Sequence, residues 1–210
     1  MVAQAQGTPG PLLVTGAANR LVLRFDATAG PLIAPVTVPY MGTLFIVFGG
    51  SSGAQASGRP MGWGDNVWGR YGVDILALPT GVWAIARNIS ERGDQFLDGA
   101  VPGPEVEAVS WGWDGVTFER RFADGSVSSC ASSYCGGAPD GSDPACLSSG
   151  AMWGGVADGK YYLHIGSSGD GSQEFSGDLA ELIVVPTHLK QDARLSKMDE
   201  LYWDWLVPGP

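Results

Sequence analysis

The sequence consists largely of short apolar or alternating segments, each bounded by glycine, proline or aspartate. Residues 21–25 (LVLRF) alternate between apolar and polar positions, which is typical of a strand with one buried face. Residues 42–48 (GTLFIVF) are almost wholly apolar, which predicts a strand in the middle of a sheet. The segments 107–113 and 116–122 flank Asp114-Gly115, a pair that favours the tight turn of a β-hairpin. Most of the chain is therefore expected to form antiparallel strands.

Only the segment 189–206 has the periodicity of a helix, because its apolar residues recur every three or four positions. The residues expected on the apolar face are Leu195, Met198, Leu201 or Tyr202, and Trp205. Pro208 follows and cannot continue a helix. Many strands, one short C-terminal helix and no alternation of strands with helices predict an all-β, antiparallel sandwich.

The net charge of the chain argues against two classes of partner, nucleic acid and anionic membrane. The formal net charge is −10 and the isoelectric point is about 4.4, a balance that repels nucleic acid and anionic lipid. We interpret the local run Glu119-Arg120-Arg121 as a solvated strand face. Apolar runs fall short of the ~18 residues of a membrane span, so we expect no membrane insertion. The N-terminus lacks a basic region followed by an apolar one, so we expect no secretory signal peptide.

The organisation predicted from these patterns is one domain with an extended arm. Residues 1–19 contain early glycine and proline and are expected to form the arm, and residues 20–207 the domain. Residues 123–150 are rich in Ser, Gly, Asp and Cys and poor in large apolar residues, so we expect a long surface loop. The loop holds all the cysteines, Cys130, Cys135 and Cys146, either as three thiols or as one disulfide and one thiol. Neither His164 nor His188 is near enough in sequence to suggest a zinc site.

One arrangement of motifs resembles a known family. The run GDLAELIVV (177–185), a short link and then LKQDAR (189–194) followed by a tryptophan resemble the C-terminal signature of LamG-like, concanavalin A-like domains. The strand YMGTLFIVF, the segment GRPMGWGD and the hairpin SWGWDGVTFERRFADG are similar in order, so the resemblance covers residues 20 to 207. The position where the family usually has a helix-opening serine holds Lys190, a poorer N-cap.

The resemblance implies two curved antiparallel sheets in a jelly-roll sandwich, with the C-terminal helix closing one side. It also bears on Glu181, an acid in the middle of the apolar run 177–185. In the family this acid belongs to the scaffold, so we expect Glu181 to be structural and to bind backbone or an arginine.

The sequence gives little support for catalysis. Glucanases of this fold resemble E-x-D-x-E along one strand, and the nearest match, Glu105-Val106-Glu107, lacks the third acid. We therefore interpret it as the start of a strand at the surface. Ser51 lies in GGSSG, but the residues after it do not form the helix that a nucleophile elbow requires. We expect the protein not to be an enzyme.

Two kinds of binding site are candidates. Acid-rich turns supply oxygen ligands for calcium, although plain polar turns are the alternative. The calcium candidates are Asp140, Asp143, Asp170 and Glu174. For sugars, the segment 63–71 combines aromatic rings with planar polar groups, the two chemistries of lectin sites. The glycan candidates are Trp63, Asp65, Asn66, Trp68, Arg70 and Tyr71, with one tryptophan in the core as the alternative. Trp111 and Trp113 share a strand face and would extend the platform if that face is concave.

These observations predict a non-catalytic, lectin-like module with no cofactor other than calcium. The resemblance favours a surface appendage of a virion or virion-like particle, where similar stand-alone domains occur. Its partners would be host-surface polysaccharide and other appendage subunits, with many copies strengthening weak sugar contacts, and we expect a homo-oligomer. The alternatives are a purely structural decoration or spike-base protein and, less favoured, a glycoside hydrolase.

Overall fold

The chain forms a two-sheet sandwich with one helix. The computed structural model describes residues 3–4, 9–16, 19–26, 28–34, 36, 42–51, 54–64, 72–87, 92–98, 101–112, 115–132, 163–167 and 174–207. Every strand pairing within these ranges is antiparallel. The all-β, antiparallel jelly-roll sandwich predicted above is therefore confirmed.

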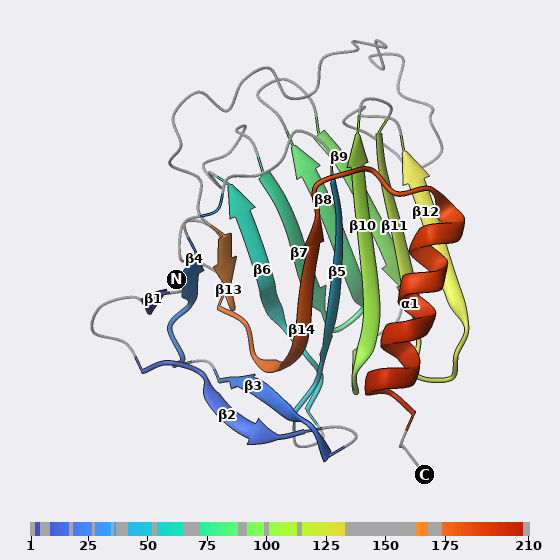
Figure 1. Cartoon of the computed structure of the whole chain (residues 1–210). Helices are drawn as coiled ribbons and strands as arrows, with labels where there is room; N and C mark the ends of the chain where they lie inside the picture. The colour runs from blue at the N-terminus through green and yellow to red at the C-terminus, as the bar shows by residue number, and fades with distance from the viewer. Residues whose placement is uncertain are drawn as a thin grey trace.

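Each sheet has seven strands among the described residues. The sheet at the back in Figure 1 has the order β1 (Ala3–Gln4), β4 (Leu32–Ala34), β13 (Leu163–Ile165), β6 (Gly58–Gly64), β7 (Gly72–Leu78), β8 (Gly81–Arg87) and β9 (Arg92–Asp98). The helix-side sheet has the order β12 (Val127–Ser132), β11 (Gly115–Arg121), β10 (Glu105–Gly112), β5 (Gly42–Gly49), β14 (Gly177–Val185), β3 (Leu21–Phe25) and β2 (Leu12–Thr15).

The alternation of side chains along β5 builds two apolar layers. Leu44, Ile46 and Phe48 enter the core between the sheets, together with residues of the back sheet such as Met61. Phe45 and Val47 point to the other face and pack under α1 (Gln191–Trp205), which lies across the helix-side sheet (Figure 1). All residues of β5 are buried, which confirms the predicted central strand.

The helix has the expected apolar face with one unexpected member. Met198, Leu201 and Trp205 are buried against the sheet, but the fourth buried residue is Arg194. At the N-terminus Lys190 makes no side-chain capping hydrogen bond, in line with its being a poor N-cap.

Two boundaries differ from the expectation. Residues 1–19, expected as an extended arm outside the domain, contribute β1 to one edge of the back sheet and β2 to one edge of the helix-side sheet. The segment expected as a loop from residue 123 contains β12, which pairs along β11 and includes Cys130. These three strands were missed because β1 has two residues and β2 four, and because β12 is rich in serine, whereas pairing with a neighbour satisfies their backbone groups. Residues 133–150, with Cys135 and Cys146, lie outside the described part of the chain.

The charged run in β11 is not a solvated face. Glu119 and Arg120 are fully buried. Glu119 points toward α1 and Arg120 points into the core between the sheets, because consecutive residues of a strand face opposite sides. Arg121 lies again on the helix side, where it pairs with Asp199. The expectation was wrong because each of these charges has an opposite charge placed against it.

Among the described residues, no helix has both the length and the apolar character that crossing a bilayer requires.

Candidate ligand-binding pocket

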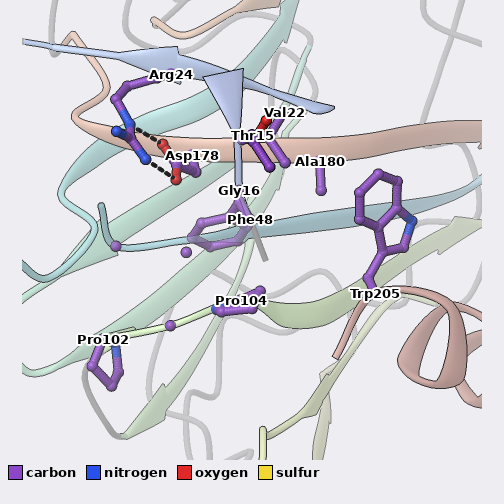
Figure 2. Close-up of a pocket in the computed structure, with 13 residues that line it drawn as sticks. Thr15, Gly16, Val22, Arg24, Phe48, Pro102, Pro104, Asp178, Ala180 and Trp205 are labelled. Atoms are coloured by element: carbon purple, nitrogen blue, oxygen red, sulfur yellow. Dashed lines mark hydrogen bonds and ion pairs between the residues drawn. The ribbon is translucent and has the colours of Figure 1, made fainter. Parts of the chain in front are cut away.

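A pocket of about 400 Å³ lies beside the C-terminal end of α1 (Figure 2). This volume falls in the usual range of small-ligand sites, ~300–1,000 Å³. The walls come from β2 and β3, from β5, β14 and the chain before β10, and from the last residue of the helix. The lining residues are Thr15, Gly16, Val22, Arg24, Phe48, Gly49, Gly50, Pro102, Gly103, Pro104, Asp178, Ala180 and Trp205.

A β-bulge in β14 shapes one wall. Leu179 faces Phe48 across the pair and lies in the inter-sheet core, but the register with β5 then shifts, so that Glu181 faces Val47. The extra residue, Ala180, lines the pocket. Bulges of this kind redirect side chains, and here the bulge turns both Ala180 and Glu181 to the helix side of the sheet.

Glu181 is a structural partner of the pocket's tryptophan. The indole Nε1 of Trp205 donates a hydrogen bond to Glu181 Oε2 at 2.6 Å. The Arg20 guanidinium lies over the same ring, with its central carbon 5.1 Å from the ring centroid. The structural role expected for Glu181 fits this contact, although its partner is a tryptophan rather than backbone or arginine. Trp205 is thereby held in one orientation at the end of the pocket.

The opposite end of the pocket holds an arginine–aspartate pair (Figure 2). Arg24 and Asp178 are register partners on β3 and β14. Arg24 donates from Nε to Oδ1 and from Nη2 to Oδ2 of Asp178, both at 2.7 Å. The hydrogen bonds that Arg24 donates to Asp178 raise the pKa of Arg24 above its ordinary value, so the guanidinium stays charged. Both side chains keep some exposure, 30% for Arg24 and 17% for Asp178, so they are accessible to a ligand.

Close backbone approach closes the side of the pocket near Gly49. A Cβ added to Gly49 would lie 2.2 Å from the carbonyl oxygen of Gly103, so a residue with a side chain does not fit there. Gly103 itself is different, because a Cβ added to it would meet no atom within 4 Å. Pro102 and Pro104 flank Gly103 and, together with Val22 and Ala180, give the pocket apolar surface.

Of the predicted glycan residues, Trp63 is the one that the structure describes, and it does not line this pocket. Trp63 is 1% exposed, packs in the inter-sheet core and donates from Nε1 to the carbonyl oxygen of Val36 at 2.7 Å. Its assignment as a sugar platform is therefore wrong, since its ring is covered on both sides. The other candidates, Asp65, Asn66, Trp68, Arg70 and Tyr71, lie outside the described residues, as does Trp113, and of Trp111 only the backbone in β10 is described.

The acid pair of β10 is buried rather than at the surface. Glu105 is 4% exposed and Glu107 is fully buried between the sheets. Arg120 Nε lies 2.6 Å from Glu105 Oε2 and 3.2 Å from Glu107 Oε1. Burial raises the pKa of Glu105 despite Arg120, and it raises the pKa of Glu107 well above its ordinary value, with the Glu105 charge adding to the effect. The surface interpretation missed Arg120, which lies on the next strand and brings both acids inside.

The remaining candidate residues, Ser51 and the calcium candidates, do not come together as a site within the described residues. Ser51 follows β5, and the described chain after it leads into β6 and not into a helix. Of the calcium candidates, Glu174 is described and exposed, whereas Asp140, Asp143 and Asp170 fall outside the described ranges. Within those ranges, His, Cys, Asp and Glu side chains do not gather in groups of three or more that suit a metal ion. Calcium binding stays a prediction.

Sequence reasoning did not find the pocket because its residues come from six separate segments. One signal was available. In residues 177–185, strict alternation would place Glu181 on the same face as Leu179, which is a core position. An acid at such a position indicates either a buried partner or a shift in alternation, and the structure has the shift.

Comparison with known proteins gives similarity of fold without a family. No family model matches the chain, and no curated protein matches it. Among solved structures, it is similar to the enzymatically active domain of tailspike protein 2 from bacteriophage CBA120, with a TM-score of 0.61 and 15% identity over 99% of this chain and 31% of that one. It is also similar to a GH54 α-L-arabinofuranosidase, with a TM-score of 0.59 and 15% identity over 99% of this chain and 49% of that one.

A third similar structure is the CBM40 domain of the Ruminococcus gnavus IT-sialidase bound to α2,3-sialyllactose. Its TM-score is 0.51 and its identity 13%, over 91% of this chain and 97% of that one. The chain thus spans about half of the arabinofuranosidase chain and about a third of the tailspike chain. At these identities the likeness shows a β-sandwich consistent with a concanavalin A-like fold. The resemblance of residues 20–207 to the LamG-like family stays a prediction from the sequence.

Proposed function

We propose that this protein is a non-catalytic carbohydrate-binding module and that the pocket between Trp205 and the Arg24–Asp178 pair is its sugar site. The pocket's composition carries the proposal. Sugars present apolar C–H faces and hydroxyl edges, and the pocket offers aromatic and proline surface together with a charged donor–acceptor pair. Carboxylate and guanidinium groups held 2.7 Å apart give a hydroxyl both an acceptor and a donor in fixed positions.

The comparisons support a sugar-related role. The R. gnavus domain was solved with sialyllactose, the arabinofuranosidase is named for a sugar substrate, and the tailspike domain comes from a phage. Shared fold alone does not assign function, so these neighbours raise the expectation of sugar binding without naming a sugar.

The absence of catalysis is part of the proposal. The carboxylates nearest to the glucanase pattern, Glu105 and Glu107, lie between the sheets and face Arg120, where a glycosidic bond has no access. In the pocket, both oxygens of Asp178 accept hydrogen bonds from Arg24, so this carboxyl group is engaged in an ion pair rather than aimed at a bound sugar as a catalytic acid.

The biological setting is proposed as the surface of a virion or virion-like particle. An acidic, sandwich-shaped subunit suits an exposed position, and many copies on one particle would strengthen weak binding to host polysaccharide. The attachment would use residues before β2 and contacts with other appendage subunits, including copies of the same chain. Calcium, if bound, would use the acid-rich turns that contain Asp140 and Asp170.

The proposal is tested by binding of the full chain to a glycan array and to whole host cells. Signal on the array should disappear in Gly103→Leu, because the leucine side chain would occupy space that the sugar needs. The variant should still fold, since a Cβ added to Gly103 meets no atom within 4 Å. Incubation with the bound glycan should release no reducing sugar. Release that is lost in Glu105→Gln or Glu107→Gln would instead assign a glycoside hydrolase.

A second candidate function, a purely structural subunit, is favoured by the edge strand β2. Leu12 and Leu13 are 60% and 64% exposed, and they lie on opposite faces of a strand that pairs on one side with β3. Such an edge can pair with another chain. The structural role replaces the sugar-binding one under two conditions. The chain binds neither to the glycan array nor to host cells, and Leu13→Lys disrupts its assembly onto the particle.

A further inference from the structure

We propose that the pocket is selective for neutral sugar units and discriminates against anionic ones such as uronic acids and sialic acids. This inference rests on the proposed function, because it names the class of sugar that the same pocket takes. It follows from the charges around the pocket.

The positive charge inside the pocket is already neutralised. Arg24 would be the natural anchor for a sugar carboxylate, since arginine binds carboxylates through two parallel hydrogen bonds. Asp178 occupies that geometry, with both of its oxygens 2.7 Å from Arg24 nitrogens. An anionic ligand would have to displace Asp178 or approach it closely, and like charges at short range repel. A hydroxyl group can bind to the pair without displacing either member.

The charges at the tryptophan end give an excess of negative charge. Arg20 lies over the Trp205 ring and pairs with Asp204 at 3.4 Å. Glu181 accepts the hydrogen bond from Trp205, which is a neutral donor. Counting both ends of the pocket, there are two positive groups, Arg20 and Arg24. The negative groups are three: Asp178, Glu181 and Asp204. The net charge of −10 on the whole chain has the same sign.

The test uses matched sugars that differ in one group. An array carries glucose, galactose and mannose glycosides beside glucuronic, galacturonic and mannuronic acid glycosides, so each pair differs by a hydroxymethyl group replaced with a carboxylate. We expect the intact chain to bind the neutral member of at least one pair at least ~10-fold more tightly than the acidic member. Sialyllactose and lactose form an additional pair.

The substitution Asp178→Asn exposes the charge of Arg24 and should reverse the preference. We expect binding of the acidic member to rise by at least ~10-fold relative to the neutral one. The matched control is Asp199→Asn, which removes one negative charge from an exposed position on α1 and should leave the preference unchanged. Gly103→Leu should abolish binding of both members.

A second measurement needs no variant. Binding of the neutral sugar by the intact chain should be almost unaffected between about 0.05 and 0.5 M salt, whereas recognition of an anion weakens with screening. Binding with a preference for acidic sugars, or with strong salt dependence, would overturn this inference and leave the sugar-binding function standing. Sugar binding that survives Gly103→Leu would show that the site lies elsewhere and would also overturn it. Binding to no member of any pair, together with an empty glycan array, would overturn the proposed function itself.

Discussion

At the scale of single residues, Glu181 and Trp205 satisfy each other's hydrogen-bonding groups. The bulge at Ala180 turns Glu181 to the helix side, where Trp205 closes the apolar layer under α1. A carboxylate that is partly buried needs a hydrogen-bond donor, and an indole N–H that is partly buried needs an acceptor. Each group satisfies the other at 2.6 Å.

The first prediction concerns a substitution that removes this hydrogen bond but keeps an aromatic ring. Trp205→Phe should lower the free energy of unfolding by about 1–2 kcal/mol, because the Glu181 carboxylate loses its donor. Chemical denaturation measures the change. Trp203→Phe is the control, since Trp203 is 64% exposed on the same helix, and it should change stability by less than about 0.5 kcal/mol. Equal effects of the two substitutions would contradict the structural role of the Glu181 contact.

The buried trio of Glu105, Glu107 and Arg120 makes stability depend on pH. Burial holds the pKa of Glu107 well above 4.5, so the folded state keeps a proton that the unfolded state releases above that pH. The free energy of unfolding contributed by this group is therefore largest at low pH and falls as pH rises from about 4.5 toward the folded-state pKa. Each unit of difference between the two pKa values costs ~1.4 kcal/mol at pH values above both.

The second prediction follows from that sign. Glu107→Gln should raise the free energy of unfolding at neutral pH and should reduce its decline as pH rises above about 4.5, because glutamine has no proton to release. Denaturation curves for both proteins across this range test it. If the two curves fall in parallel with increasing pH, Glu107 does not carry the dependence.

At the scale of elements, β11 makes ion pairs on both of its faces. Glu119 pairs with Arg194 of α1 at 2.7 and 3.0 Å, and Arg121 pairs with Asp199 of the same helix and lies over the Tyr202 ring. Arg120, between them, pairs with the acids of β10 in the core. The helix is therefore fixed to the sheet by buried charge as well as by apolar packing.

The third prediction separates a buried ion pair from an exposed one on the same helix. Arg194→Met should destabilise the protein by about 3–5 kcal/mol, because it leaves the buried Glu119 carboxyl group without its arginine partner. Lys197→Met removes the exposed pair Lys197–Glu200 and should cost no more than about 0.5 kcal/mol. Thermal and urea denaturation of both variants provide the comparison, and a small effect of Arg194→Met would contradict the account of how α1 is held.

The fourth prediction concerns the N-terminal strands. Deleting residues 1–8 removes β1 and should leave the sandwich folded, because β1 has two residues at a sheet edge. Deleting residues 1–16 also removes β2 and the pocket residues Thr15 and Gly16, so it should lower the melting temperature and abolish sugar binding. Circular dichroism and array binding of the two truncated chains test this. A fully stable, sugar-binding chain lacking residues 1–16 would contradict the role given to β2.

Features set by local sequence could be predicted, whereas features set by contacts between distant segments could not. Strand class, the central position of β5 and the C-terminal helix were predictable, because alternation and helical periodicity are local properties of the chain. The burial of Arg120 and Glu107 was not, because it depends on which strands become neighbours. The pocket was not predictable either, since Arg24, Pro104 and Trp205 meet only after the sheet has formed.

At the scale of the whole molecule, the pocket lies beside β2, β3 and the C-terminal end of α1 (Figure 1). The sequence-based candidate Trp63 lies instead in the core between the sheets and does not line this pocket. The sequence-based hypothesis and the pocket proposal therefore assign the sugar to different residues, which an experiment can distinguish.

Chemical-shift mapping by NMR on the full chain of 21.9 kDa shows directly whether a sugar binds in this pocket. A glycan that binds on the array is titrated into the isotope-labelled protein. We expect the largest shifts at the backbone amides of Gly49, Gly50 and Gly103 and at the indole N–H of Trp205. Shifts confined to residues 65–71, or no shifts at a saturating concentration of the glycan, would contradict the pocket as the sugar site.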